Sequence, residues 1–360
     1  MKLIKGATHY HGQILGPGYV LLGTESARDC QVTYHLPLLD RNAGHFVFGF
    51  QGVGCHFLVK VCRQRGLIAV YHIKDGIPVY LNHVLVRLPE NAALEILQDA
   101  DFLSVSSSGY GLISVLHDGN AEGEWGFGVA GRSRLSRPSI EIAHRPKQDL
   151  EWIVLGDGFS NNRWPNRHFV SWPELLFGTT LRYLNACVAA ANSRRVLTLA
   201  VRLAPRIRNT NVIVAMGTDD LIEGHGIESL LRNVDKLLTV LEGAGARDVW
   251  IANLPPVKSL EAHVSEWNKA LSQRLRGTHI KLVDIHSLLM TNPSSYMEQG
   301  NYPSAEGQWV IAEHLASLLK IVIPRRPDMM SPRKTLFGNM LLRLSRLIAR
   351  AGSNTISLNP

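Results

Sequence analysis

The chain has few cysteines and no long apolar run. Its 360 residues include only Cys30, Cys55, Cys62 and Cys187, whose spacing does not match a zinc motif. No segment reaches the roughly 18 uninterrupted apolar residues of a membrane span, and the opening residues, MKLIKGATHYHG, lack the apolar run of a signal peptide. These absences exclude a membrane-spanning helix and favour reduced thiols. We therefore expect a cytoplasmic protein with no metal and no other cofactor.

Acidic residues are outnumbered by basic ones. The chain has 38 Lys and Arg against 30 Asp and Glu, a net charge of +8. Much of the excess lies in the tail after Pro324, which carries Asp328 as its only acid. Elsewhere no basic stripe interleaved with aromatic residues is evident, so nucleic acid is not an expected partner.

Residues 334–351 have the pattern of a basic amphipathic helix. Apolar and basic side chains fall on opposite faces, Phe337, Met340, Leu341, Leu344, Leu347 and Ile348 on one and Arg343, Arg346 and Arg350 on the other. Such a helix suits an anionic membrane surface or the groove of a partner protein, which would make the protein peripheral at the membrane. Folding back onto the chain's own core or a sister subunit is an equally good interpretation. We treat 324–360 as a separate tail.

Residues 1 to about 145 are β-rich. Short apolar strands recur at a spacing of roughly 8–12 residues, with turn clusters between several of them, which is typical of a β-sandwich or jelly roll. We expect strands at 45–50, 57–61, 67–71, 79–86, 111–115 and 125–129. The one helical signal is a short turn at Asn91–Gln98. We assign 1–147 to this domain.

Two aromatic residues of this domain suggest a ligand. Tyr110 and Trp125 could stack on sugar rings, because β-sandwiches of this kind often bind glycans. Burial in the core is the more common role of such side chains. Carbohydrate binding is therefore one of two interpretations.

From Glu151 onward, strands and helices alternate. Buried strands are predicted at 152–155, 212–216, 249–253 and 280–285, and helices at 227–242, 260–276 and 304–320, while 175–191 is helical or mixed. This alternation implies a parallel sheet covered by helices on both faces. We assign 148–323 to this α/β domain.

The first of these strands ends in a glycine-rich turn. Trp152–Leu155 leads into Gly156-Asp157-Gly158, and Ser160-Asn161-Asn162 follows as a candidate helix cap. Ligands collect at the carboxyl ends of parallel strands, where helix N-termini offer free N–H groups. Asp219 and Asp220 follow another strand, so three carboxylates could form a cation pocket. Hydrogen bonding to the backbone is the simpler role for Asp157 and Asp220.

Five sequence blocks in a fixed order carry a family resemblance. They are LGDG (155–158), GTDD (217–220), ANLPPV (252–257), LVDI (282–285) and NYPSAEGQWVIAEHL (301–315). In this order they resemble the SGNH or GDSL-type hydrolases over 151–322, about half of the chain. The resemblance implies a flavodoxin-like, three-layer α/β/α fold. A sandwich placed before such a domain is similar to the layout of carbohydrate esterases that carry an N-terminal jelly roll.

The resemblance implies acyl transfer to a serine, and the chain departs from every working position. Gly158 stands where the nucleophilic serine belongs, and Ala190 where a glycine N–H would stabilise the oxyanion. Asp219 replaces an asparagine amide, Gln299 the orienting acid and Tyr302 the general base. With a pKa near 10, tyrosine is a poor base at neutral pH.

These departures indicate a pseudoenzyme, a non-catalytic protein that binds a ligand or serves as a scaffold. Its ligand would be a glycan or an acylated substrate. Asp157, Gly158, Asp219 and Tyr302 are the candidate ligand-binding residues.

A relocated active site is the alternative. Ser160 would then be the nucleophile and His225 or His286 the base, in a carbohydrate O-acyl esterase or acyltransferase. Two helical residues turn a side chain by about 200°, so Ser160 would not point where the family's serine points. A hydroxyl at the start of a helix and surface histidines are the simpler interpretations.

Overall fold

The computed structural model describes residues 2–4, 8–10, 13–15, 18–21, 30–35, 44–52, 54–89, 92–99, 102–107, 109–117, 123–129, 134–136, 139–144, 150–161, 169–178, 182–298, 302–323 and 326–327. Gln299 and the tail beyond Pro327, with its predicted helix at 334–351, lie outside the described residues.

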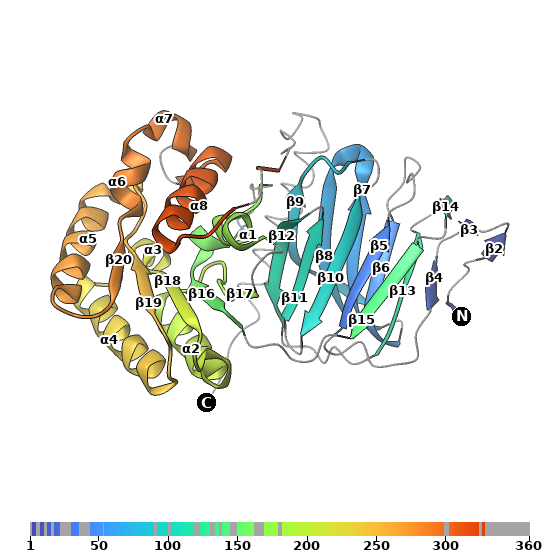
Figure 1. Cartoon of the computed structure of the whole chain (residues 1–360), viewed down its shortest axis with the longest axis horizontal. Helices are drawn as coiled ribbons and strands as arrows, with labels where there is room; N and C mark the ends of the chain where they lie inside the picture. The colour runs from blue at the N-terminus through green and yellow to red at the C-terminus, as the bar shows by residue number, and fades with distance from the viewer. Residues whose placement is uncertain are drawn as a thin grey trace.

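Two antiparallel sheets form the N-terminal domain, as predicted (Figure 1). The larger sheet has the order β1-β4-β13-β6-β7-β8-β9, with β1 (Lys2–Ile4), β4 (Gly18–Leu21), β13 (Glu124–Val129), β6 (Gly44–Gly52), β7 (Cys55–Cys62), β8 (Leu67–Lys74) and β9 (Ile77–Leu85). The smaller has the order β12-β11-β10-β5-β15, with β12 (Tyr110–Leu116), β11 (Phe102–Ser107), β10 (Ala93–Asp99), β5 (Cys30–His35) and β15 (Ser139–His144). A third, small sheet joins β14 (Arg134–Ser136), β3 (Gln13–Leu15) and β2 (Thr8–Tyr10).

Apolar side chains of both sheets meet in one core. Tyr34 of β5 lies against Phe46 and Phe48 of β6, with ring centroids 4.4 and 6.1 Å apart. Trp125 is only 7% exposed within this core, and Tyr110 packs against it half-buried. The structure therefore favours the core role of these two aromatics over sugar stacking.

The expected helical turn at Asn91–Gln98 is wrong, because β10 occupies this segment. Leu94 and Ile96 are buried while Glu95 and Leu97 are half-buried, which is the two-residue period of a strand. β10 pairs antiparallel with both β5 and β11. Sheet pairing on both sides outweighs the weak local helix preference of the segment.

Two histidines are buried in the sandwich as neutral side chains. Burial, together with the charge of Lys60, lowers the pKa of His45 to about 4, and burial also lowers the pKa of His56. The unfolded chain, whose histidines have a pKa near 6.5, therefore binds protons at these sites more readily than the folded domain. Above pH 6.5 these histidines are neutral in both the folded and the unfolded chain, so they do not change the free energy of unfolding. Below pH 6.5 the free energy of unfolding falls as the pH drops toward 4.

We expect His45 alone to account for a loss of about 3 kcal/mol between pH 6.5 and 4. Urea unfolding at pH 7.5, 6, 5 and 4, followed by circular dichroism, measures this slope. His45→Gln removes the titrating group, so its stability should depend less on pH than that of the wild type. Equal slopes for the two proteins would contradict the assignment.

The C-terminal domain is built on five parallel strands. Their order is β17-β16-β18-β19-β20, with β16 (Trp152–Gly156), β17 (Tyr183–Asn185), β18 (Asn211–Ala215), β19 (Val249–Ala252) and β20 (Lys281–Val283). In chain order this is 2-1-3-4-5, the order of flavodoxin-like folds, as the sequence predicted. The helices are α1 (Trp172–Phe177), α2 (Ser193–Ile207), α3 (Thr218–Ile222), α4 (Ile227–Gly243), α5 (Glu261–Leu275), α6 (Ile285–Met290), α7 (Pro293–Tyr296) and α8 (Ala305–Leu319). Short elements complete the domain: η2 (Gly158–Ser160), η3 (Lys258–Leu260), β21 (Met297–Glu298) and β22 (Tyr302–Pro303).

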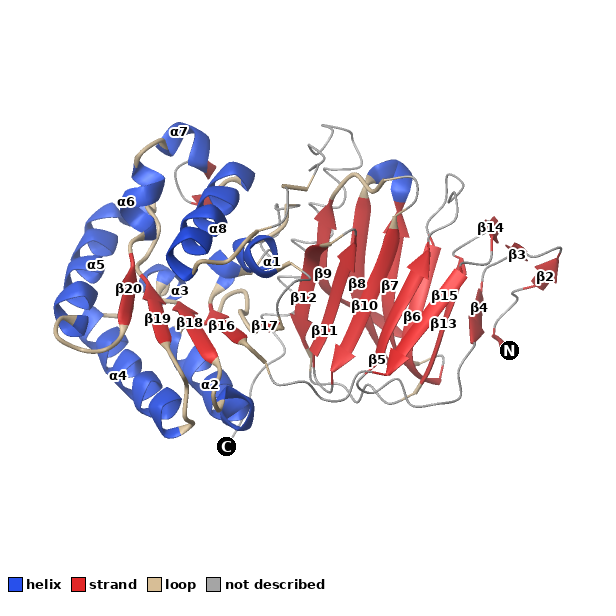
Figure 2. Ribbon diagram, viewed as in Figure 1, coloured by secondary structure: helices blue, strands red, loops and turns tan. Residues whose placement is uncertain are grey.

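Helices cover both sides of the parallel sheet (Figure 2), and alternate residues of β16 belong to two different apolar clusters. Trp152 and Val154 belong to the cluster that contains the apolar side chains of α1, α6 and α8. Ile153 and Leu155 belong to the cluster formed with α2, α4 and α5. The sheet is therefore buried on both faces. None of the helices in the described segments is long and apolar enough to cross a membrane.

The two domains are joined by direct packing. A Cβ atom on Gly111 of β12 would lie 2.7 Å from Tyr183 Oη and 3.1 Å from the carbonyl oxygen of Glu174. Ser114 Oγ lies 3.4 Å from Tyr183 Oη. Phe102 of β11 belongs to the cluster beneath α2, α4 and α5. The sandwich is thus seated on the edge of the α/β domain beside β17 (Figure 1).

Candidate functional site

The candidate site lies where the strand order reverses. β16 has β17 on one side and β18 on the other, so the connections that leave β16 and β18 start from adjacent strand ends. Asp157 follows β16, and Gly217 to Asp220 follow β18. In open α/β sheets this position is where ligands bind. The sequence prediction that these strand ends meet is confirmed.

Asp157 is a structural cross-link between the two strand ends. Its Oδ1 accepts the N–H of Phe159 at 3.0 Å, and its Oδ2 accepts those of Gly217 and Thr218 at 3.0 and 2.9 Å. The side chain is completely buried. Burial and then the charge of Asp219 raise the pKa of its carboxyl, and the backbone donors oppose that rise. Its oxygens are already taken, so this residue does not present itself to a ligand.

The turn after β16 differs from the expected helix start. Gly158, Phe159 and Ser160 form the single 3-10 turn η2, whose N-cap is Asp157 rather than a residue of Ser160–Asn162. The chain from 162 to 168 lies outside the described residues. Asp157 thus caps η2, and the predicted cap of a following helix at Ser160–Asn162 reaches into residues outside the described structure.

Ser160 is not positioned as a nucleophile. It is completely buried, and its Oγ accepts a hydrogen bond from Trp172 Nε1 at 2.9 Å. Its carbonyl oxygen accepts from Asn185 Nδ2 at 3.2 Å. Gln308 of α8 holds the same turn by donating to the Phe159 carbonyl at 3.3 Å. These contacts hold the turn, and the hydroxyl lies beside the Trp172 indole and the buried Cys187 thiol.

Asp219 lies over the backbone of the turn. The backbone N–H groups of Gly158 and Ala191 lie close to its carboxylate and lower its pKa against the larger, opposite effect of burial. The residue is 5% exposed, and its Oδ2 atom has no hydrogen-bond partner in the described structure. The resemblance implies that the N–H of position 158 stabilises an oxyanion. Here a carboxylate of the chain itself faces that N–H.

Ala190 keeps the backbone shape expected of a glycine. The resemblance places the second oxyanion glycine at this position, and Ala190 has a φ of 54°. An alanine in the left-handed region is strained by about 1 kcal/mol, because its Cβ approaches the following carbonyl. The N–H that faces Asp219 belongs to the next residue, Ala191.

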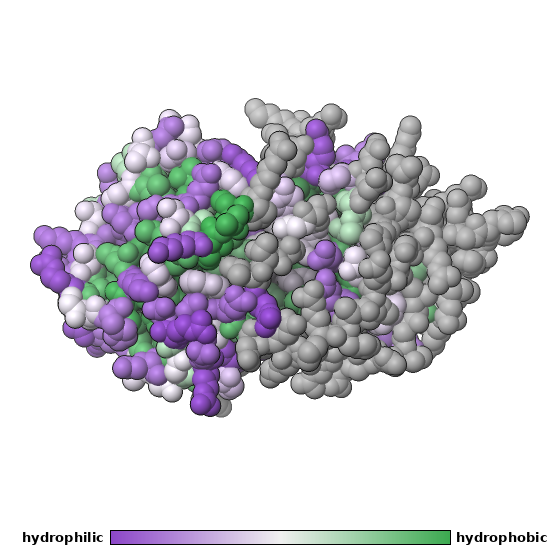
Figure 3. All heavy atoms as spheres, in the orientation of Figure 1, coloured by the Kyte–Doolittle hydropathy of each residue, from purple (hydrophilic) through white to green (hydrophobic). Residues whose placement is uncertain are grey.

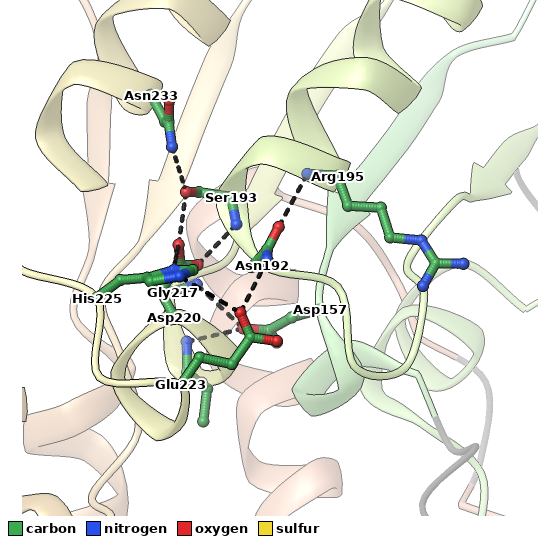
Figure 4. A network of polar contacts seen from close by, with 10 residues as sticks. Asp157, Asn192, Ser193, Arg195, Gly217, Asp220, Glu223, His225 and Asn233 are labelled. Atoms are coloured by element: carbon green, nitrogen blue, oxygen red, sulfur yellow. Dashed lines mark hydrogen bonds and ion pairs between the residues drawn. The ribbon is translucent and has the colours of Figure 1, made fainter. Parts of the chain in front are cut away.

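Asp220 joins the start of α2 to the turn after β18 (Figure 4). Its Oδ2 accepts the N–H of Ser193 at 2.7 Å and its Oδ1 accepts the Ser193 hydroxyl at 2.6 Å. Asn233 of α4 donates to the same hydroxyl at 2.7 Å. The backbone-binding role predicted for Asp157 and Asp220 is therefore confirmed. Within the described residues no group of three His, Cys, Asp or Glu side chains is arranged to hold a metal ion.

The candidate bases do not meet Ser160. His225 is 46% exposed, with Nδ1 3.4 Å from Asp220 Oδ1 and Nε2 3.7 Å from Glu223 Oε2. His286 is the second residue of α6, and its N–H donates to Asn253 Oδ1 at 3.0 Å. Tyr302 is half-buried in β22, which pairs with β21. In the described part of the chain, the hydrogen bonds and ion pairs of these two histidines do not involve Ser160.

Sequence reasoning missed a buried carboxylate behind the turn. Glu174 of α1 is almost completely buried, and its Oε1 accepts from Asn185 Nδ2 at 2.8 Å while Oε2 accepts from the Ser171 hydroxyl. Burial raises its pKa to about 6, although these donors oppose the rise. Because Asn185 also donates to the Ser160 carbonyl, Glu174 supports the turn from below. In the sequence, the only indication of this buried carboxylate is a single acidic residue within the apolar run WPELLF.

No family model and no curated protein matches the chain. Among solved structures it is similar to a member of the lipolytic G-D-S-L family from Veillonella parvula, at 15% identity over 48% of this chain and 100% of that one, with a TM-score of 0.43. It is also similar to a catalytic mutant of an acetylxylan esterase from Geobacillus stearothermophilus, at 11% identity over 49% and 96%, with a TM-score of 0.41. A third similarity is to the carbohydrate binding module CBM66 from Bacillus subtilis, at 15% identity over 39% and 94%, with a TM-score of 0.34. These similarities concern the fold alone.

Proposed function

We propose that the chain is a non-catalytic counterpart of the SGNH hydrolases, in which the α/β domain binds a ligand or acts as a scaffold. The observation that carries the proposal is the buried Asp219 carboxylate, which faces the N–H groups of Gly158 and Ala191 where an oxyanion would bind. Gly158 adds the second argument, because it has no side chain that could form an acyl-enzyme.

The physical reason lies in the charge of the transition state. Ester hydrolysis places negative charge on the carbonyl oxygen, and an active site stabilises it with hydrogen-bond donors that are free to receive it. At this site the donors face a buried carboxylate of the chain itself. A second anion would have to displace that carboxylate or lie next to a like charge in a buried setting.

The remaining acceptor suggests the kind of ligand. Oδ2 of Asp219 is buried without a partner, and such an atom is best satisfied by a hydrogen-bond donor. An amine or the hydroxyls of a glycan would supply one. Gly158 lines the same turn, and Tyr302 stays a proposed contact from the family resemblance.

The test measures ester hydrolysis and covalent labelling by a serine-reactive probe. We expect no turnover of p-nitrophenyl acetate or butyrate above the buffer rate, and no covalent label from a fluorophosphonate probe. Ser160→Ala and His225→Ala should behave as the wild type does. Turnover and labelling that disappear in Ser160→Ala would instead establish an esterase or acyltransferase with a relocated nucleophile.

A further inference from the structure

The outer face of α2 carries arginines and no acid. The helix SRRVLTLAVRLAPRI contains Arg194, Arg195, Arg202 and Arg206, and Arg208 is its C-cap. All of these except the half-buried Arg206 are exposed. Figure 3 shows strongly hydrophilic side chains over the lower part of the α/β domain, where Figure 1 places α2. The sequence pattern predicts no helix at 193–207, so it does not place these arginines on one face.

Helix α4 extends the basic surface. Asn233 of α4 donates to Ser193 of α2, which identifies the side of α4 that faces α2. Lys236, three residues on from Asn233, shares its side of the exposed surface, while Arg232 lies between Glu228 and Asp235, four and three residues away. Arg274 of α5 holds Asp235 through two hydrogen bonds of 2.8 and 2.6 Å.

We call the exposed residues Arg194, Arg195, Arg208, Arg232 and Lys236 the α2–α4 face. Within the described part of the chain none of the five forms an ion pair.

The position of two of these arginines works against the helix. Arg194 and Arg195 lie in the first turn of α2, which contains no acid, and the positive end of a helix disfavours cations. The free N–H groups there are already served, because Asn192 and Asp220 accept from Arg195 N and Ser193 N. In Figure 4 the Arg195 side chain extends away from this network. Helix stability thus does not explain the arginines, and an external anion does.

The composition of the face favours one kind of anion. Val201, 56% exposed, lies on the same side of α2 as Arg194 and Arg208, seven residues from each. Arginine pairs in bidentate fashion with phosphate, and an exposed aliphatic residue among arginines suits the headgroup region of a bilayer. The face has no exposed aromatic residue on which a nucleic-acid base could stack. We propose that the α2–α4 face binds the surface of an anionic phospholipid membrane.

The test measures sedimentation of the full chain with vesicles. The vesicles are phosphatidylcholine alone or phosphatidylcholine with 30 mol% phosphatidylserine, each at 0.1 and 0.5 M NaCl. Arg194→Glu, Arg195→Glu and Arg208→Glu are combined in one variant. Lys258→Glu, Lys269→Glu and Arg276→Glu form the matched control, with the same charge change at exposed positions in and beside α5. Glutamate is favourable in the first turn of α2, so the first variant should melt no lower than the control.

We expect the wild type to bind the phosphatidylserine vesicles at low salt and to lose most of that binding at high salt. The α2 variant should bind at least tenfold more weakly, and the control within twofold of the wild type. Equal binding of both variants would overturn the proposal and assign membrane binding to the tail or to net charge. Failure of the wild type to bind, or tighter binding to a DNA duplex than to the vesicles, would overturn it as well. No residue of the candidate site is involved, so the result is independent of the proposed function.

Discussion

Asp157→Ala is expected to lower the free energy of unfolding by about 3–4 kcal/mol. The substitution leaves the N–H groups of Phe159, Gly217 and Thr218 buried without an acceptor, each at a cost of about 1–3 kcal/mol. Loss of a buried charge beside Asp219 offsets part of that cost. Urea unfolding followed by circular dichroism measures the difference.

Asp157→Asn separates the two contributions. Asparagine keeps one acceptor oxygen and turns an amide donor toward the N–H groups on the other side, so we expect a smaller loss of about 1–2 kcal/mol. Asp248→Ala is the control, because its ion pair with Lys281 is exposed and worth less than about 1 kcal/mol. If Asp157→Ala destabilised the protein no more than the control does, the cross-link between the strand ends would not be a source of stability.

Gly156→Ala is expected to destabilise the α/β domain by at least about 3 kcal/mol. The new Cβ would lie 2.2 Å from the Ala215 carbonyl oxygen and 3.2 Å from Cys187 Sγ. Gly156 pairs with Ala215 across β16 and β18, so the strands would have to separate where the candidate site begins. Thermal and urea unfolding should both show the loss, or the protein should fail to accumulate in soluble form.

Two further variants locate the clash. Gly226→Ala is the control, since nothing lies within 4 Å of its Cβ position and its φ of −70° suits any residue. Gly156→Ala combined with Cys187→Ala should remain as unstable as Gly156→Ala alone, because the nearest obstacle is a backbone oxygen. Recovery in the double variant would instead show that the thiol causes the loss.

The sequence predicted the sheet well because buried parallel strands are nearly continuous apolar runs. The runs at 152–155 and 212–216 correspond to β16 and β18, and the amphipathic run at 227–242 to α4. The stretch 175–191 was harder. It contains the end of α1 and the three-residue strand β17, and a strand that short has too few residues to show a period.

Only part of the site could be predicted, because some of its contacts join residues that are far apart in the sequence. Strand-end residues are recognisable from local pattern, which is why Asp157, Asp219 and Asp220 could be grouped in advance. The direction of the Asp219 carboxylate depends on N–H groups 61 and 28 positions away in the chain, at Gly158 and Ala191. The burial of Ser160 depends in the same way on Trp172 and Asn185. Such contacts are fixed only when the chain is folded.

The close approach of Gly111 to Tyr183 also bears on how the chain can evolve. The two partners belong to different domains, and there is no space between them for even one methyl group. Ser114 and Phe102 extend the same contact. A recombination event that replaced the sandwich with an unrelated one would leave Tyr183 without its fitted neighbour. The two halves must therefore diverge together, as one heritable unit rather than as exchangeable modules.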